Sequence, residues 1–419
     1  MTDDAPDIGD RRPHPVPLPS RLATADLAWA SVHAVSLMAG IRELPDPDRI
    51  STAYRSDRVL AIDGIAPDVW SAYSGFWRST DGWVRTHGNY PHHAHRLLAG
   101  LGLGAGATGD AVRAAILGCT TTEAVELITA ERGLAVPVLR EDPHLDSRWR
   151  ATPLLDVTHR DADQSGSRRI PLERDEAPLS GIRVLDLTRV IAGPVCTRTL
   201  ALLGADVLRV DPPRLAEPEW QHLDTGHGKR TTLLDARSER FRELLAAADV
   251  VVLGYRPSSL DRLGLSASAL TERYPGLVIA QLTAWGLDEP DRAGFDSLVQ
   301  AESGISMIES PDGDRPGALP AQALDHSAGY LLATAVIALL ERRQRDGGSW
   351  MVRTSLRRVA AELLGMPRAD APEQVREFDT SAHSTTFDVA GRKVTTAGPA
   401  LPGLEFAAPR RWGSDQPRW

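Results

Sequence analysis

Residues 183–211 read RVLDLTRVIAGPVCTRTLALLGADVLRVD, and this stretch decides the fold. Its first five residues have an apolar strand pattern, residues 195–203 have helical spacing, and residues 207–210 have a second apolar strand pattern. A strand, a helix and a strand joined by short connections form a βαβ unit, whose strands are parallel and whose crossover is right-handed. The stretch therefore predicts an α/β protein with a parallel, Rossmann-like sheet.

The same alternation continues toward the C-terminus. We expect helices at 238–247, 266–273, 325–344 and 355–364, and strands at 249–253, 277–282 and 351–354. In open parallel sheets, ligands bind at the carboxyl ends of the strands. The functional site is therefore expected in the loops 188–194, 211–230, 254–262 and 283–300.

The chain before this sheet has a different pattern. A helical pattern at 22–38 precedes a strand hairpin at 76–84, whose turn is Asp81-Gly82, and three helical patterns at 92–100, 109–118 and 121–132. The organisation that we predict is a flexible leader (1–20), a smaller α+β domain (21–160), a polar linker (161–178), a large Rossmann-like domain (179–372) and an extended tail wrapped on a partner surface (373–419).

Composition excludes several classes of protein. The formal charge is 47 − 56 = −9 and no dense block of basic residues is present, which argues against a nucleic-acid partner. The two cysteines, Cys119 and Cys196, form no CxxC motif, which suits a reducing compartment. The longest clean apolar run spans the ten residues 331–340, whereas a membrane span needs about 20. We therefore expect a cytoplasmic protein without a membrane partner.

Asp325 lies in the first turn of an apolar helical run, ALDHSAGYLLATAVIALLERR (323–343). Asp is a favoured N-cap residue, so a structural role explains its position. The same helix end can also stabilise an ionised carboxylate in a partly apolar site, and such a carboxylate can attack an acyl carbonyl. Both interpretations stay open at this point.

Other side chains suggest anion or metal binding. Tyr255 and Arg256 directly follow the strand at 249–253, and Arg262 lies six residues later, which suits phosphate recognition or a plain solvated loop. Lys229 is one of only two lysines in the chain. Four histidines, His87, His92, His93 and His95, lie close together in sequence. Because acidic neighbours are sparse and His92 and His93 are adjacent, we predict no metal site there.

These segments, taken in order, resemble the class III CoA-transferase family (CaiB/BaiF type). The resemblance covers residues 179–364 and includes LSGIRVLDLTRVIAGP, TGHGKRTTLLD, ADVVVLGYRPSSLDRLG, GFDSLVQAESGIS and the helix that carries Asp325. Residues 21–160 resemble the smaller domain of the family, which normally follows the large domain. The chain therefore looks circularly permuted, or fused to a partial copy.

The resemblance implies an activity and roles for named residues. Asp325 would be the nucleophile that attacks an acyl-CoA, giving an acyl-aspartyl intermediate and then an aspartyl-CoA thioester, with a carboxylic acid as acceptor. The residues implied to hold coenzyme A are Val190, Ile191, Ala192, Thr225, Gly226, Lys229, Gly254, Tyr255, Arg256 and Arg262. Family members form interlocked dimers, so we expect a homodimer.

Three departures from the family keep other functions open. Phe295 stands in Gly294-Phe295-Asp296 where the racemase branch carries a catalytic His, which argues against racemisation. Ile191 stands where some transferases carry a Gln, and we find no Gly-rich lid. We place Phe295 and Asp296 in the substrate pocket. The alternatives are an acyl-CoA racemase or isomerase, for which His326 is the nearest candidate base, and a non-catalytic CoA-binding relative.

Overall fold

The computed structural model describes residues 13–161, 177–372 and 376–419. Its central element is a seven-stranded sheet in the order β5-β11-β10-β9-β6-β7-β8. The strands are β5 (Asp156–Arg160), β6 (Arg183–Leu187), β7 (Asp206–Asp211), β8 (Arg230–Leu233), β9 (Val250–Leu253), β10 (Val278–Thr283) and β11 (Ser349–Ser355). Only the edge strand β5 runs antiparallel, and its partner is β11. The predicted α/β fold with a large, mainly parallel sheet is confirmed.

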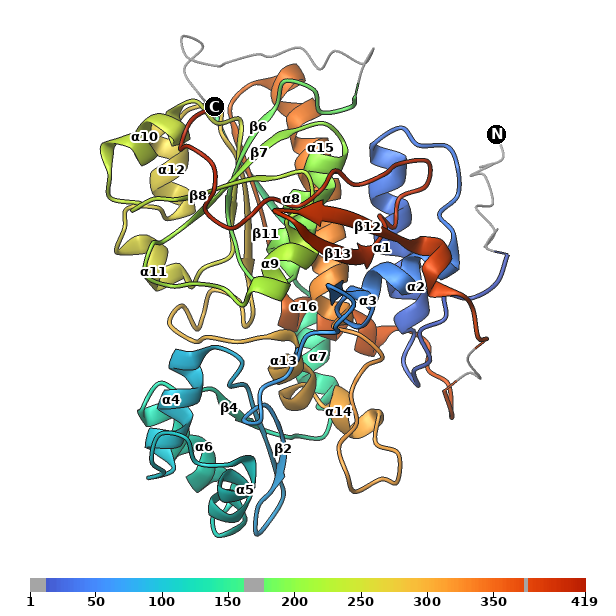
Figure 1. Cartoon of the computed structure of the whole chain (residues 1–419), viewed down its shortest axis with the longest axis vertical. Coiled ribbons are helices and arrows are strands. Elements are labelled where there is room, and N and C mark those ends of the chain that lie inside the picture. The colour runs from blue at the N-terminus through green and yellow to red at the C-terminus, as the bar shows by residue number, and fades with distance from the viewer. Residues whose placement is uncertain (1–12, 162–176, 373–375) are drawn as a thin grey trace.

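Both faces of this sheet are covered by helices (Figure 1). These helices are α8 (Ala192–Leu202), α15 (Ala323–Asp346) and α16 (Leu356–Gly365), and, on the other face, α10 (Glu239–Ala246), α11 (Pro257–Asp261) and α12 (Ala267–Arg273). Alternate residues of a strand therefore enter different cores: Val184 faces the α8–α15 side and Leu185 faces the α10–α12 side. This two-sided burial explains why the strands are continuous apolar runs.

The helix α15 is the core of the molecule. It packs against α8 and against α1 (Thr24–Met38), and a Cβ atom at Gly329 would lie 2.6 Å from the carbonyl oxygen of Ala192. Among the described residues, α15 is the one helix long and apolar enough to cross a membrane, but 83% of that apolar window is buried inside the protein. Its apolar character is therefore that of a core helix.

A smaller lobe has its own sheet and its own core. The antiparallel sheet β2 (Gly75–Arg78), β3 (Trp83–Thr86) and β4 (Ala135–Pro137) packs with α4 (Pro91–Gly100), α5 (Gly109–Leu117) and α6 (Thr121–Ala130). The predicted hairpin is present, and α6 begins with a capping box between Thr120 and Glu123. In Figure 1 this lobe lies below the large sheet.

The N-terminal region is distributed over all three sheets. Besides the small lobe, it supplies β5 to the large sheet, α1 to the central core, and β1 (Ala61–Ile62) to a third sheet with β12 (Ser384–Val389) and β13 (Arg392–Ala397). The remaining elements are α2 (Pro47–Tyr54), α3 (Ser56–Val59), α7 (Pro143–Arg150), α9 (Glu219–Thr225), α13 (Asp296–Glu302), α14 (Ile305–Ile308) and the short 3-10 helix Thr380–His383.

The predicted flexible leader and the predicted extended tail both contain residues that pack against the rest of the protein. In the predicted leader, Val16 and Leu18 are buried, while residues 1–12 lie outside the described residues. The predicted extended tail contains the hairpin β12–β13, and its final residue packs on the chain itself, since the Trp419 indole donates to the Leu244 carbonyl oxygen at 2.8 Å. The predicted linker falls largely on residues 162–176, outside the described residues.

Candidate active site

A cleft of about 440 Å³ separates the large sheet from the small lobe. All four loops expected to hold a site at the carboxyl ends of the strands contribute to its lining, for example through Val190, Pro212, Arg256 and Phe295. The small lobe contributes the opposite wall, which carries Tyr90, His92, His93, Arg96, Arg132 and Leu134. Three of them, His92, His93 and Arg96, belong to α4, which lies below α11 in Figure 1.

Asp325 lines this cleft and is only 5% exposed. It is the third residue of α15, and the N-cap is Gln322, so the N-cap interpretation is wrong. Burial, and next the negative charge of Asp296, raise the pKa of Asp325 well above its usual value. The expectation that the helix end keeps this carboxylate readily ionised is therefore also wrong. Desolvation and a like charge outweigh the effect of the helix end.

Asp296 holds the first turn of α15 in place. Its Oδ2 accepts the backbone N–H of Asp325 at 2.9 Å, and its Oδ1 accepts the Gln300 side chain at 2.5 Å. Burial raises the pKa of Asp296 to about 6, although these hydrogen bonds act in the opposite direction. Asp296 lies behind the cleft wall rather than in its lining, whereas its neighbour Phe295 does line the cleft.

The loop between β6 and α8 approaches the cleft in a strained conformation. Val190 has a φ of 75°, which is unusual for a β-branched residue, and its N–H donates to Glu217 Oε1 at 2.8 Å. Ala192 and Gly193 also line the cleft, but Ile191 does not. Gly193 is required, because a Cβ atom there would lie 2.4 Å from the Thr188 side chain.

Glu217 is a buried residue that the sequence analysis did not identify. Its carboxylate accepts hydrogen bonds from Val190 N–H and from Arg209, and it also accepts one from the Tyr90 hydroxyl at 3.3 Å. Tyr90 directly precedes α4, so Glu217 connects the strained loop of the large domain to the small lobe. Its sequence context offers no signal for this role, since Glu217 lies in a Pro-containing stretch without periodicity.

The predicted nucleotide-binding loop lies at the cleft, with one exception. Gly254, Tyr255 and Arg256 line the cleft, and the guanidinium of Arg189 lies 5.8 Å from the centre of the Tyr255 ring. The Arg262 side chain is 64% exposed, donates to Ser259 Oγ at 3.0 Å and does not line the cleft.

The predicted contacts at Thr225, Gly226 and Lys229 are not at the cleft. Lys229 is 1% exposed, and its Nζ donates to Asp186 Oδ2 at 3.1 Å and to the Pro194 carbonyl oxygen at 3.0 Å. Thr225 is likewise buried, and neither it nor Gly226 lines the cleft. Lys229 therefore contacts the first turn of α8 without lining the cleft itself.

The histidine cluster faces the cleft in part. His92 and His93 line it, and the ring of His87 stacks on Phe295 with a centroid distance of 3.8 Å. Burial, and next the charges of His92 and Arg96, lower the pKa of His93 to about 3. His93 is therefore neutral at pH 7.

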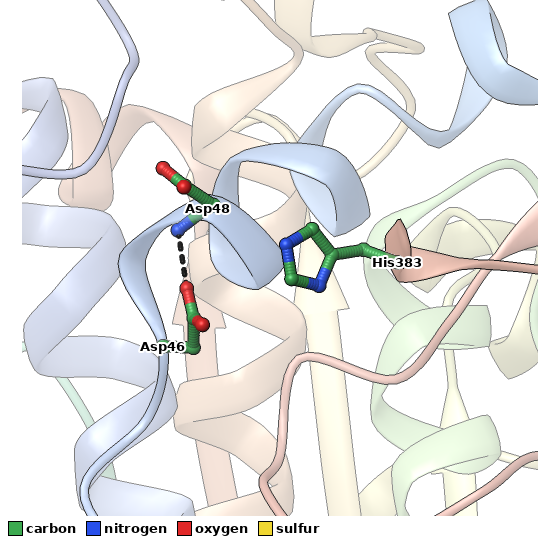
Figure 2. Close-up of side chains that lie close together, drawn as sticks. All are labelled: Asp46, Asp48 and His383. Atoms are coloured by element: carbon green, nitrogen blue, oxygen red, sulfur yellow. Dashed lines mark hydrogen bonds between the residues drawn. The ribbon is translucent and has the colours of Figure 1, made fainter. Parts of the chain in front are cut away.

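A different group of side chains has the spacing of metal ligands. Among the described residues, oxygen and nitrogen atoms of Asp46, Asp48 and His383 lie within 4.8 Å of one another (Figure 2). The Asp46 carboxylate already caps α2 by accepting the Asp48 N–H at 2.7 Å, and Asp48 forms an ion pair with Arg376. Both carboxylates have structural roles, so we assign no metal to this group.

An α/β protein with a cleft at the carboxyl ends of its parallel strands has the architecture of a protein that binds a small-molecule ligand there. The model of CoA-transferase family III matches residues 179–392. The chain belongs to this family. The match begins at the predicted start of the large domain and extends through Asp325.

Curated relatives match between 41% and 74% of the chain. A probable fatty acyl-CoA transferase of Mycobacterium tuberculosis is 34% identical over 215 residues, which are 46% of this chain and 54% of that protein. The mouse succinyl-CoA:glutarate CoA-transferase is 33% identical over 191 residues (41% and 43%). An acyl-CoA transferase of Gibberella moniliformis is 28% identical over 346 residues (74% and 59%). The chain thus spans about half the length of the curated relatives it matches.

Solved structures give matches of similar extent. A crystal structure of the Mycobacterium protein is 35% identical with a TM-score of 0.41, covering 45% of this chain and 56% of that one. A CaiB/BaiF family protein from Brucella suis is 28% identical with a TM-score of 0.42 and the same two coverages.

Proposed function

We propose that this protein transfers coenzyme A between an acyl-CoA and a carboxylic acid, with Asp325 as the nucleophile. The observation that carries the proposal is that Asp325 is the one carboxylate among the described residues that line the cleft. The relatives named as CoA-transferases of succinate and glutarate support the reaction class. Acyl-CoA and a free carboxylic acid are therefore the substrates we propose.

The reaction follows from carboxylate chemistry. An Asp325 oxygen attacks the thioester carbonyl, the C–S bond breaks, and an acyl-aspartyl anhydride and a CoA thiolate form. The thiolate then attacks the aspartyl carbonyl, which releases the first carboxylic acid and leaves an aspartyl-CoA thioester. The acceptor carboxylate repeats these two steps in reverse order and leaves as the new acyl-CoA. The raised pKa of Asp325 makes its ionised form more basic, and therefore a stronger nucleophile.

The residues of the cleft are suited to a CoA thioester. Arg189 and Arg256 lie on the large-domain side and Arg96 and Arg132 on the small-lobe side, so several guanidinium groups can meet phosphates. The Tyr255 ring can pack against the adenine base of coenzyme A. The homodimer and the cytoplasmic location stay proposals, based on the family resemblance and on cysteine usage.

An acyl-CoA racemase or isomerase is the second candidate. His326 does not support it, because its ring stacks on Tyr54 at 4.9 Å and does not line the cleft. His93 does line the cleft, but a pKa of about 3 makes its imidazole a weak base. The racemase or isomerase therefore stays the second candidate, with less support from the residues of the cleft.

The first experiment separates these functions. The protein is incubated in D₂O with a panel of acyl-CoAs and free carboxylic acids, and the thioesters are identified by mass spectrometry. We expect a new acyl-CoA made from an added acid. Deuterium on an otherwise unchanged acyl-CoA, without a new thioester, would contradict the transferase and support the racemase.

The Asp325→Ala variant tests the nucleophile. We expect a loss of turnover of at least about 10³-fold, because no other carboxylate among the described residues lines the cleft, while CoA binding measured by calorimetry is retained. The matched control is Asp346→Ala at the opposite end of the same helix, where the carboxylate is largely solvated. Binding of CoA without turnover in the unmodified chain would favour a non-catalytic relative.

A further inference from the structure

One helix of the small lobe presents a row of nitrogen-bearing side chains to the cleft. His92, His93 and Arg96 all belong to α4 and all line the cleft. Arg189 and Arg256, from the loops of the large sheet, line the same cleft. Burial is the main cause that lowers the pKa of both histidines, and the Arg96 charge lowers both further, with smaller effects of Arg189 on His92 and of Arg256 on His93.

The two arginines of the large domain, Arg189 and Arg256, each already have an interaction partner within the protein. Arg189 forms an ion pair with Asp211 at 3.2 Å, and Arg256 donates to the carbonyl oxygen of Asp291 at 3.1 Å. Arg96 has neither an ion pair nor a hydrogen bond with any of the described residues, although it is partly buried. A guanidinium that lines the cleft and has no partner among the described residues is available to bind an anion there.

His93 adds an unused polar atom at the same place. Its Nδ1 is buried and has no hydrogen-bond partner among the described residues. The neutral ring carries one N–H, so it can donate a hydrogen bond to an oxygen without adding another charge. An unpaired guanidinium and an unpaired imidazole nitrogen therefore occur three residues apart on one helix, which places them on the same face.

We propose that His93 and Arg96, together with Arg256 across the cleft, form a subsite for an oxygen anion of the substrate. Resting on the proposed function, the anion is either a phosphate of coenzyme A or a second carboxylate carried by the acyl group. Both offer the oxygens that a guanidinium fork recognises. The subsite combines residues from two separate parts of the fold, so a bound anion contacts both the small lobe and the loop after β9.

The test measures ligand binding to Arg96→Gln in the Asp325→Ala background, which prevents turnover of acyl-CoAs. The ligands are CoA, inorganic pyrophosphate, butyryl-CoA and succinyl-CoA, whose acyl chains have the same length but differ by one carboxylate. We expect Arg96→Gln to weaken binding about tenfold or more, which is the loss of one charge-assisted hydrogen bond. Arg96→Lys should restore part of the affinity. The matched control is Arg113→Gln, on α5 of the same lobe, which pairs with Asp110 and does not line the cleft.

The outcomes identify the anion or overturn the subsite. An equal loss for CoA, pyrophosphate and both thioesters supports a phosphate at the subsite. A loss confined to succinyl-CoA supports a second carboxylate. Unchanged affinity of Arg96→Gln for all four ligands overturns the proposal. Because binding is measured without turnover, this result is separate from a failure of the proposed transferase activity.

Discussion

At the scale of single residues, two buried carboxyl groups define the chemistry of the cleft. Asp296 accepts the Asp325 N–H, and its charge raises the pKa of the Asp325 carboxyl in addition to burial. Asp296 therefore positions the proposed nucleophile and makes it more basic. Two like charges in a shared buried site cannot both ionise easily, so the pair titrates as a unit.

This coupling predicts a change in the pH profile of the Asp296→Asn variant. Asn keeps an oxygen for the Asp325 N–H but removes the negative charge, so the pKa of Asp325 should fall. Since the attacking form is ionised, the ascending limb of kcat should move to lower pH, by about one unit. The measurement is kcat from pH 4 to 9, with Asp346→Asn as the control. An unmoved limb in Asp296→Asn would show that the Asp296 charge does not set the proton affinity of Asp325.

At the scale of elements, the connection from β6 to α8 depends on a buried ion pair. Lys229 bridges Asp186 on β6 and the carbonyl oxygen of Pro194 in the first turn of α8. Thr197 Oγ1 donates to the same Asp186 carboxylate at 2.6 Å. Burial lowers the pKa of Lys229 to about 8 even though Asp186 acts to raise it. The ion pair therefore holds the connection from β6 to α8 in place, although burying its two charges costs desolvation free energy.

We predict that Lys229→Met lowers the free energy of unfolding by about 3 kcal/mol, because it leaves the Asp186 carboxylate buried without its counter-charge. The measurement is urea unfolding followed by circular dichroism. Lys393→Met is the matched control, since Lys393 is the only other lysine and is exposed. A large loss of CoA affinity with unchanged stability would instead support the direct CoA contact that the family resemblance implies.

The same pair predicts a pH dependence of stability. The pKa of Lys229 is about 8 in the folded state, against 10.5 for an ordinary lysine. Between these values the unfolded chain binds the proton more tightly, so stability rises with pH from about 8 toward 10.5, and this pH-linked increment is lost as the pH falls back to about 8. The difference in unfolding free energy between the wild type and Lys229→Met should therefore grow from pH 8 to 9.5. A constant difference would contradict the lowered pKa.

At the scale of the whole molecule, the order of segments along the chain does not match their order in space. The small lobe precedes the large sheet in sequence, yet β5 pairs with β11 and α1 packs on α15. Figure 1 shows the first helix beside α15 in the middle of the fold. The N-terminal region is therefore part of the central core as well as of the cleft wall.

This arrangement predicts that the two halves assemble when expressed as separate chains. Fragments 1–161 and 177–419, co-expressed with an affinity tag on one of them, should copurify, because Val32 and Val35 of α1 belong to the same buried core as α15. The measurement is gel filtration of the purified complex, with fragment 177–419 alone as the control. A soluble, well-folded 177–419 that does not retain its partner would contradict the shared core.

Sequence alone determined the parallel sheet, its helices and the loops that form the cleft, because strand and helix periodicity and short connections are local properties. It also singled out Asp325, by its place at the start of an apolar helix and by the family resemblance. Only the tertiary structure decided that Lys229 is buried behind the cleft while His93, Arg96 and Glu217 lie at or beside it. Burial and proximity depend on which distant segments pack together, and here the small lobe meets strands and loops that follow it by about 50 residues or more in sequence.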